Sequence, residues 1–588
     1  MCPNTVRHCW ETVEITLKAT HAYANPYTDV TVWVDLEGPG FSERCYGFWD
    51  GGATFRVRVT ATAPGEWCWT SGCRPADPGL RGKTGVFTAV EWTEEEKQEN
   101  PCRRGFIRPT DNGHAFQYAD GTPFFLLGDT WWPAGTFRYP LADRDVEHPP
   151  GPGMTLQDAL RYRAGQGYNS VAMIAAFPAW ANDGRPAKLV ADDGTCIRQA
   201  WEQAGTGSAK DMHDETGNRP FRFPGRVPGY EDVFPDIERP NPAYWRSFDA
   251  TVRYMNSVGF IPFIEVARRD VGQAWRKYYD WPESYVRYVQ YVWSRLQANN
   301  CLLSPIHYDW RECTIRTDEW NAAANLVVER YGPPPFGQPV GCNPDGSSLH
   351  NFGHVDRARW LSFHQIGNRR THESHEMLPE QFHQKPPVPS INGEPYYEGW
   401  HQGPQAPVGS AEAARNCRGA LWGSVLSGAL GGHVYGAEGL WAGDVEPEAE
   451  HRWWESLTWP SGAQMQHCRS FLLSQGTRYR DLVPQADLVQ PSRAGAPDTY
   501  RGWAYCARTE EWGLLMLYFE KDCPRATIEG LPPGREYEAR WFDPREGEWL
   551  EEPGRLAADQ QGELPLPPFP GEAETSQTDW ALKLTAVG

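Results

Sequence analysis

The hydrophobic period changes twice along this chain, and that change constrains the fold more than any single motif. Between residues 106 and 475, short apolar runs alternate with longer stretches of helical periodicity. Alternating strands and helices are typical of a parallel sheet whose strands are joined by helical crossovers. We count eight such strands, which predicts a (β/α)8 TIM barrel, a fold of roughly 250 residues before insertions.

The elements of this barrel are expected at defined positions. The predicted strands are 123–132, 169–178, 259–267, 301–310, 348–354, 359–367, 386–399 and 428–441. The predicted helices include 155–168, 241–259, 283–300 and 412–428, and Asn241 ahead of Pro242 is a typical start of a helix. The insert at 180–240 is rich in Gly, Asp and Pro, and we expect it to shape the substrate subsites.

The two flanking regions alternate with period two, as β-strands do. Residues 1–92 and 476–588 show runs such as VEITLKA and WGLLMLYFE between Gly, Pro and Asn turns, which predicts an N-terminal and a C-terminal β-sandwich. The turn DPREGE between two apolar runs indicates a hairpin. The charged stretch 93–105 is the expected linker to a catalytic barrel at 106–475.

Charge and composition exclude several classes. The net charge of −20 argues against a nucleic-acid partner, which requires a basic surface. The sequence has no run of 18 apolar residues, so we expect no membrane-spanning helix. The first residues do not resemble a signal peptide and the 14 cysteines form no CxxC, so we expect a cytoplasmic protein, or a secreted one if a leader has been removed. Most thiols are expected to be free and buried, with a Cys68–Cys73 bridge as the weaker alternative.

The working residues of a (β/α)8 barrel lie at the carboxyl ends of its strands. Carboxylates, imidazoles and aromatic side chains follow the apolar runs here, with few clustered lysines or arginines and no GxxxxGKS loop, unlike a phosphate site. The candidates for substrate binding are Asp129, Trp131, Trp132, His307, His354, His364, Tyr397, Glu398, His433 and Trp441.

Carboxylates among aromatic side chains suit the cleavage of a glycosidic bond. One protonated acid donates to the leaving oxygen, and one carboxylate attacks the sugar or activates water. Asp309 and Glu394 end two different predicted strands and are the candidate catalytic pair. We expect Glu394 to attack the anomeric carbon, and Asp309 to be the acid/base with a raised pKa.

Three stretches carry a family resemblance: LLGDTWW at 126–132, INGEPYYEG at 391–399 and WGSVLSGALGGHVYGAEGLW at 422–441. They resemble the apiosidase-like (DUF4038) glycoside hydrolase barrels, and the N-terminal segment resembles the DUF5060 sandwich that often precedes them. ARWFDPREGEW at 539–549 resembles a C-terminal module described as collagen-binding. The resemblance implies that Glu394 is the catalytic carboxylate of the NGEP stretch and that Asp309 ends the fourth strand. Members of the family commonly end this strand with a GGD-like or GNE-like sequence, whereas this chain reads IHYDW.

Several alternatives stay open. Glu265 or Glu312 could be the acid in place of Asp309, and Asp129 is expected to accept a substrate hydroxyl. Trp131 and Trp132 cannot both face the site, because successive side chains alternate. The histidines could be core residues. THESHE at 371–376 is not a HExxH metal motif and is expected to be a solvated loop or helix.

We therefore predict a glycoside hydrolase that acts on an oligosaccharide or glycoside, with no cofactor and no metal. The expected two-carboxylate mechanism is retaining, and inversion stays open because the sequence does not give the carboxyl separation. Two alternatives are a carbohydrate-binding protein on a catalytically degenerate barrel and a metal-dependent barrel hydrolase or isomerase. The first would bind sugars without turnover. The second would carry bound metal and lose activity in chelator, but the histidines show no ligand spacing.

Overall fold

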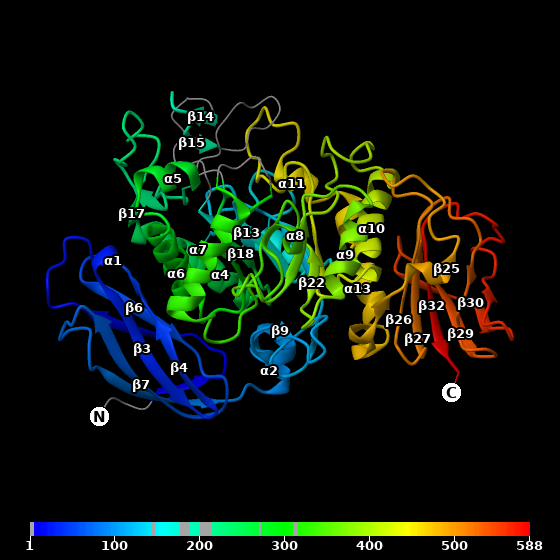
Figure 1. Ribbon diagram of the computed structural model, residues 1–588, viewed down its shortest axis with the longest axis horizontal. Coiled ribbons are helices and arrows are strands. Elements are labelled where there is room, and N and C mark those ends of the chain that lie inside the picture. Colours follow the sequence, from blue (N-terminus) through cyan, green and yellow to red (C-terminus); the bar gives the residue numbers. More distant parts are fainter. Residues whose placement is uncertain are drawn as a thin grey trace.

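The computed structural model of the chain describes residues 5–142, 148–176, 188–199, 213–269, 272–309 and 315–587. Figure 1 shows three regions in chain order: a sheet-rich N-terminal region, a central sheet surrounded by helices, and a sheet-rich C-terminal region. The protein is therefore multidomain. No helix in the described ranges is long and apolar enough to cross a bilayer.

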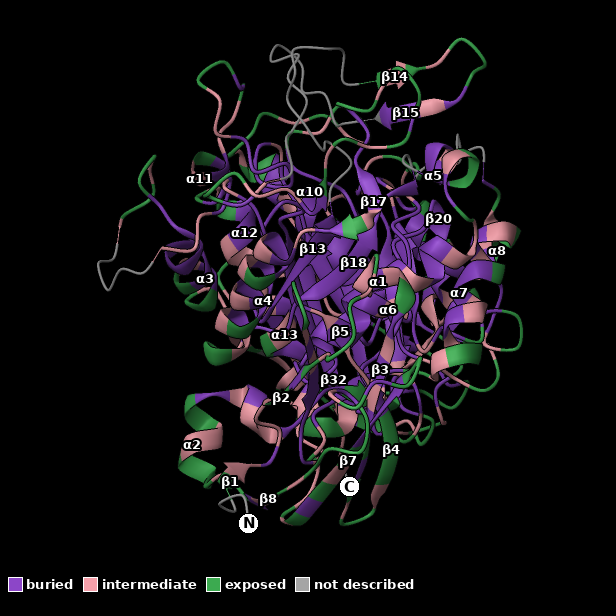
Figure 2. Cartoon of the chain, turned by 90° about the vertical axis from the view of Figure 1, so that its left-hand side faces the viewer, coloured by how far each residue is buried: buried purple, intermediate pink, exposed green. Residues whose placement is uncertain are grey.

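The central region is built on an eight-stranded sheet in the order β19-β18-β13-β12-β23-β22-β21-β20. Neighbouring strands run parallel except β20 and β21, which are antiparallel. The strands are β12 (Leu126–Thr130), β13 (Ser170–Ala176), β18 (Phe263–Ala267), β19 (Leu302–Ser304), β20 (Gly346–Ser347), β21 (His364–Gly367), β22 (Ser390–Asn392) and β23 (Gly432–Tyr435). Each parallel strand lies within one of the predicted runs, and Figure 2 shows β13 and β18 buried at the centre.

Helices connect and cover these strands. The main ones are α3 (Leu156–Ala164), α4 (Pro242–Ser257), α6 (Glu283–Leu296), α7 (Thr317–Tyr331), α9 (Glu373–Phe382) and α10 (Ala411–Leu426). The predicted start of α4 is confirmed, because the Asn241 side chain accepts a hydrogen bond from the Ala243 N–H at 3.3 Å. The Thr155 side chain caps α3 in the same way. Local capping therefore sets where these helices begin.

One predicted strand is wrong. Residues 348–354 contain helix α8 (Ser348–Phe352), in which Ser348 and Phe352 are buried four residues apart. A run this short fits a buried helical turn as well as a strand, so its hydrophobic pattern does not distinguish the two.

The insert after β13 is described only in part. Its described residues form two small antiparallel pairs, β14 (Lys188–Val190) with β15 (Cys196–Gln199) and β16 (Phe221–Arg222) with β17 (Asp236–Pro240). The expectation that the insert shapes the subsites falls largely on residues 177–187 and 200–212, which lie outside the described residues.

The N-terminal region contains two sheets that share one core. The first has the order β1-β8-β7-β3-β4 and the second β2-β6-β5. Leu17, Val34 and Val57 from the two sheets meet in that core. The strands are β1 (Thr5–His8), β2 (Val13–Lys18), β3 (Thr31–Gly38), β4 (Phe41–Tyr46), β5 (Phe48–Trp49), β6 (Thr54–Val59), β7 (Gly65–Arg74) and β8 (Thr84–Val90).

The cysteines in the described ranges form no disulfide. Cys68 is exposed and Cys73 is buried, and they are not bridged, so the weaker alternative of a disulfide is wrong. Most of the other described thiols are buried, as expected. Cys2 and Cys313 lie outside the described residues.

The segment expected to be a linker is folded. It contains helix α2 (Glu94–Glu99) and the 3-10 turn η1 (Pro101–Arg104). Thr93 and Glu96 form a capping box at the start of α2. The Asn100 side-chain amide then donates to the Asn256 carbonyl at the end of α4, at 3.0 Å. The segment is therefore fastened to the central region.

The C-terminal region also has two sheets, β24-β26-β27-β32-β29-β30 and β25-β28-β31. The predicted hairpin is confirmed, because β29 (Glu536–Asp543) pairs with β30 (Glu548–Ala557) antiparallel across DPREGE. The other strands are β24 (Val483–Pro484), β25 (Val489–Gln490), β26 (Ala504–Arg508), β27 (Leu514–Phe519), β28 (Thr527–Ile528), β31 (Leu564–Pro565) and β32 (Trp580–Ala586).

The THESHE stretch contacts this C-terminal region, and the expectation that it is solvated is wrong. His372 and His375 are buried, and the His372 ring stacks on Trp503 with centroids 4.0 Å apart. His372 Nε2 lies 2.7 Å from a Glu520 carboxylate oxygen. In the sequence the two histidines stand among polar residues, so no hydrophobic pattern predicts their burial. They are interior because the C-terminal region packs against them.

A buried ion cluster joins the N-terminal sheets to the central helices. Asp249 on α4 binds Arg295 on α6 at 2.5 Å and Arg58 on β6 at 2.8 Å. Burial alone would raise the pKa of Asp249, but the two guanidinium groups outweigh it and lower the pKa to about 2. The carboxylate is thus ionised in the folded protein at every ordinary pH.

We expect Asp249→Ala to lower the free energy of unfolding by about 3–5 kcal/mol, because it leaves two buried guanidinium groups uncompensated. Because the folded pKa lies below the unfolded one, the contribution of Asp249 is present above about pH 4 and is lost as the pH falls toward 2. Urea unfolding at pH 7 and pH 3 measures both effects.

The matched control is Asp35→Ala, which removes the exposed Arg44–Asp35 pair and should cost at most about 1 kcal/mol. Equal losses from the two variants would contradict this account of the cluster.

Candidate active site

A cavity of about 160 Å³ lies where several strands of the central sheet end. Its lining comes from the segments that follow β12, β18, β19, β21, β22 and β23, so residues far apart in sequence meet there. The lining residues are Trp132, Arg268, Arg269, Asp309, Asn368, Arg370, Glu394, Tyr397, Trp400, Gln402 and Trp441. Both carboxylates of the candidate pair are among them.

Glu394 follows β22 and is held by two donors. The Asn343 side-chain amide donates to Oε2 at 2.7 Å, and Arg370 Nη2 donates to Oε1 at 3.0 Å. The carboxylate is 6% exposed. Two donors on opposite oxygens fix the orientation of the carboxylate.

The glycine of the NGEP stretch makes this arrangement possible. A Cβ at Gly393 would lie 2.0 Å from the Gln365 side-chain nitrogen, so no other residue fits without displacing Gln365. The Gln365 amide in turn donates to Asn343 Oδ1 at 3.1 Å, which leaves the Asn343 amide nitrogen directed at Glu394. Gly393 is thus part of the support of the carboxylate.

Asp309 lies beside three cationic side chains. It accepts a hydrogen bond from Arg269, Arg268 lies 3.7 Å away, and His307 Nε2 is 3.3 Å from Oδ1. Burial would raise the pKa of Asp309, but Arg269, His307 and Arg268 outweigh it and hold the pKa well below its ordinary value. The expectation of a raised pKa is therefore wrong, because the charges around Asp309 are cationic.

Behind Asp309 lies a fully buried pair, Glu265 at the centre of β18 and His307. Glu265 Oε2 is hydrogen-bonded to His307 Nδ1, and Oε1 accepts the Asn343 backbone N–H at 2.8 Å. Burial raises the pKa of Glu265. Burial would lower the pKa of His307, but Glu265 and then Asp309 raise it to about 9. Neither side chain belongs to the cavity lining.

The aromatic residues divide between cavity and core. Trp132, Tyr397 and Trp441 line the cavity, together with Trp400, whose ring meets that of Trp441 at 80° with centroids 5.3 Å apart. Trp131 instead stacks on Tyr139 at 5.2 Å in the interior. The two neighbouring tryptophans thus diverge, as alternation requires.

Other predicted site residues lie in the interior. Asp129 is buried in an ion pair with Arg163 of α3 at 2.6 Å, and burial raises its pKa. Glu398 is fully buried and accepts the Gly409 N–H at 2.5 Å. Neither belongs to the cavity lining, so the structure does not support the expected contact with a substrate.

The remaining predicted histidines are also interior. His354 and His364 form a buried pair with ring nitrogens 3.0 Å apart. His433 is buried in β23, and burial lowers its pKa to about 3. All three fit the core alternative and lie outside the described cavity lining.

Sequence reasoning missed the arginines of the cavity and the amide of Asn343, which binds Glu394. The expectation of few clustered cations is wrong, because Arg268, Arg269 and Arg370 all line the cavity. Arg268 and Arg269 directly follow β18, so the strand-end rule could have found them. Arg370 and Asn343 lie on loops, and no pattern in the sequence points to them. Glu312 lies outside the described residues.

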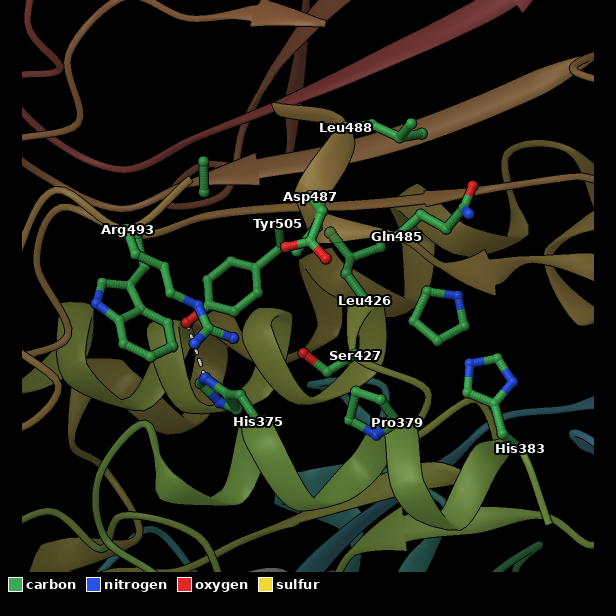
Figure 3. Close-up of a pocket in the computed structure, with 14 residues that line it drawn as sticks. His375, Pro379, His383, Leu426, Ser427, Gln485, Asp487, Leu488, Arg493 and Tyr505 are labelled. Atoms are coloured by element: carbon green, nitrogen blue, oxygen red, sulfur yellow. Dashed lines mark hydrogen bonds between the residues drawn. The ribbon is translucent and has the colours of Figure 1, made fainter. Parts of the chain in front are cut away.

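A larger cavity of about 360 Å³ lies elsewhere, between α9, the end of α10 and the C-terminal region (Figure 3). Its lining includes Trp503, but that side chain is 4% exposed, stacks on His372 with centroids 4.0 Å apart, and lies 4.6 Å from the Arg493 guanidinium. Arg493 itself pairs with Glu376. Trp503 is therefore packed against other side chains, and the cavity that holds both Glu394 and Asp309 is the better candidate site.

Comparisons with known proteins agree with this architecture. Residues 110–478 match the family described as "Apiosidase-like, catalytic domain", and residues 6–74 match the domain of unknown function DUF5060. No curated protein matches the chain significantly.

Solved structures share the fold at low identity. A Bacteroides vulgatus protein provisionally assigned as a glycoside hydrolase has a TM-score of 0.64 and 15% identity, with 99% of this chain and 100% of that chain covered. A glycoside hydrolase family 5 protein of the same organism has a TM-score of 0.55 and 18% identity, covering 83% and 94%. These likenesses concern the fold, and the match to the catalytic domain spans more than half of the chain. The chain therefore belongs to the apiosidase-like family.

Proposed function

We propose that this protein hydrolyses a glycosidic bond in an oligosaccharide or glycoside, with Glu394 and Asp309 as the two working carboxylates. The observation that carries the proposal is that both line one cavity together with four aromatic side chains. Aromatic faces match the apolar faces of sugar rings, and paired carboxylates are what glycoside cleavage requires. The family supports the same class of reaction.

We propose a retaining course in two steps. Glu394, oriented by Asn343 and Arg370, attacks the anomeric carbon while the leaving oxygen takes a proton. Asp309 gives that proton and then accepts one from the water that releases the sugar. Retention predicts that the first-formed product keeps the anomeric configuration of the substrate, which NMR of a fresh digest measures.

We also propose that the central sheet closes as a (β/α)8 barrel. Support comes from residues 339–341, which stand between β19 and β21. Leu303 N–H donates to the Pro339 carbonyl at 2.9 Å, and Gly341 N–H donates to the Leu303 carbonyl at 3.0 Å. On the other side, Ser362 N–H donates to the Val340 carbonyl at 2.8 Å. This segment would be the fifth strand, in place of the predicted 348–354.

The proposed modules are a barrel at 106–475 between β-sandwiches at 1–92 and 476–588, joined at the first boundary by 93–105. Shared cores between paired sheets support the sandwiches. Their proposed role is to brace the barrel, because buried ion pairs such as Arg418–Asp579 cross the boundary.

A carbohydrate-binding protein without turnover is the second candidate. The observation that favours it is the low pKa of Asp309, since a carboxylate held ionised by cations is a poor proton donor. This candidate predicts that sugars bind to the cavity and are released unchanged.

We expect Glu394→Ala to lower kcat/KM by about 10⁴–10⁶-fold for every glycoside that the wild type cleaves, because no other group forms the bond to the anomeric carbon. A panel of aryl glycosides that includes furanosides measures this. The matched control is Glu412→Ala, an exposed carboxylate in the first turn of α10, which should keep wild-type activity. Turnover within tenfold of wild type in the Glu394 variant would refute the role of Glu394.

Asp309→Ala should discriminate between leaving groups. We expect a loss of about 10²–10⁴-fold for substrates with poor leaving groups and a much smaller loss for dinitrophenyl glycosides, because a good leaving group departs without a proton. Azide should partly restore this variant and yield a glycosyl azide of retained configuration, opposite to that from a rescued Glu394 variant. A uniform loss across leaving groups would assign the acid to another residue.

Metal removal should have no effect. The described residues contain no group of three or more His, Cys, Asp or Glu side chains placed to hold a metal ion. We expect activity on aryl glycosides to stay within about twofold of the untreated enzyme after dialysis against EDTA, and metal analysis to find less than one equivalent. Loss of activity that zinc or another divalent metal restores would favour the metal-dependent alternative instead.

A further inference from the structure

The two cavity carboxylates are linked by one continuous chain of contacts. Asn343 donates through its side chain to Glu394 and through its backbone N–H to Glu265. Glu265 binds His307 Nδ1, and His307 Nε2 lies 3.3 Å from Asp309 Oδ1. A fully buried carboxylate–imidazole pair therefore stands directly behind Asp309, where the proposed reaction needs a proton.

We propose that Glu265 and His307 are a proton-holding pair that supplies Asp309 with the proton it gives to the leaving group. This inference rests on the proposed function for the role of Asp309, but the proton-holding pair itself is a property of the resting protein. Glu265 and His307 do not touch the cavity, so they act through Asp309 as positioning residues.

The pair retains one proton at neutral pH. The imidazolium is hydrogen-bonded through Nδ1 to the Glu265 carboxylate, and its Nε2 lies 3.3 Å from Asp309 Oδ1. Both pKa values are raised above their ordinary values, which describes one proton shared between two coupled groups. A histidine without this carboxylate would be largely neutral at pH 7 and above.

The groups around the pair are consistent with this role. His307 meets Glu265 from β18, Asp309 from its own segment, and the edge of its ring lies against Trp132 at 4.7 Å. Asp309 faces Arg268 and Arg269 as well, and these cations keep it ionised until the leaving oxygen develops charge.

The transfer balances as two linked steps. As the glycosidic bond breaks, the His307 Nε2–H bond breaks and its proton passes to Asp309, which gives a proton to the leaving oxygen and is a carboxylate again. His307 is then neutral with its proton on Nδ1, facing Glu265. When water attacks the glycosyl-enzyme, its proton passes to Asp309 and returns to His307 Nε2, so the starting charges are restored.

Glu265→Gln tests the pair with little change in shape. The Asn343 backbone N–H requires the amide oxygen at the Oε1 position, so the amide NH2 faces His307 Nδ1. That nitrogen must then accept, which makes His307 neutral while its Nε2–H still faces Asp309. The variant therefore removes the charge of His307 and leaves its Nε2–H beside Asp309.

The first readout is the titration of the His307 ring, followed by NMR of histidine-labelled protein and assigned from the signal lost in His307→Gln. We expect His307 to stay protonated up to about pH 8 in the wild type and to shift its pKa by at least one unit downward in Glu265→Gln. A wild-type pKa below 7, or an unchanged titration in Glu265→Gln, would overturn the proposal.

The second readout is the pH profile on aryl glycosides. We expect Glu265→Gln to lower kcat/KM about 10²-fold for poor leaving groups, to spare dinitrophenyl glycosides within about tenfold, and to move the basic limb to lower pH. An equal loss on all substrates with an unmoved pH profile would show a merely structural role and overturn the relay.

The matched control is Asp77→Asn, a buried carboxylate of the N-terminal region bound by Thr20 and Gly79. It should lower stability without changing the discrimination between leaving groups or the His307 titration. If the wild type cleaves no glycoside, the proposed function fails, while the NMR titration still judges the proton-holding pair by itself.

Discussion

The candidate site depends on Asn343, which holds two buried carboxylates at once. Its side chain donates to Glu394 and its backbone N–H donates to Glu265. A buried carboxylate without donors carries a desolvation cost of several kcal/mol, so each acid must lie where a donor reaches it. One residue therefore ties the positions of the acid on β18 and the acid after β22 to each other.

The flanking regions support this arrangement from outside the sheet. Arg370, the second partner of Glu394, lies two residues before His372, whose N–H donates to the Pro497 carbonyl at 3.1 Å. The His372 ring pairs with Glu520 of the C-terminal region. On the opposite side, Asp249 ties the N-terminal sheets to α4 and α6. The modules thus hold the central region through buried charges, which tolerate little displacement.

Much of the architecture could be predicted from local pattern. The parallel strands lie within the predicted runs because a continuous apolar stretch between two helical stretches is typical of a strand that is buried on both faces. The capping of α4 by Asn241 and the DPREGE hairpin are local as well, since the residues that decide them are adjacent in sequence. Glu394 and Asp309 stood out because each follows an apolar run, where parallel pairing brings strand ends to one edge.

The sequence by itself determined the parallel strands, the main helices and the strand ends that carry the candidate carboxylates. Only the tertiary structure decided which side chains meet there. Asp129 follows the same rule as Glu394, yet Arg163 of α3 neutralises it in the interior. Arg370 comes from a loop whose course no periodicity encodes, and it reaches the cavity. The physical reason is that hydrophobic periodicity shows which face of a single helix or strand is buried. The partner of a charged side chain depends instead on how elements far apart in the sequence pack together.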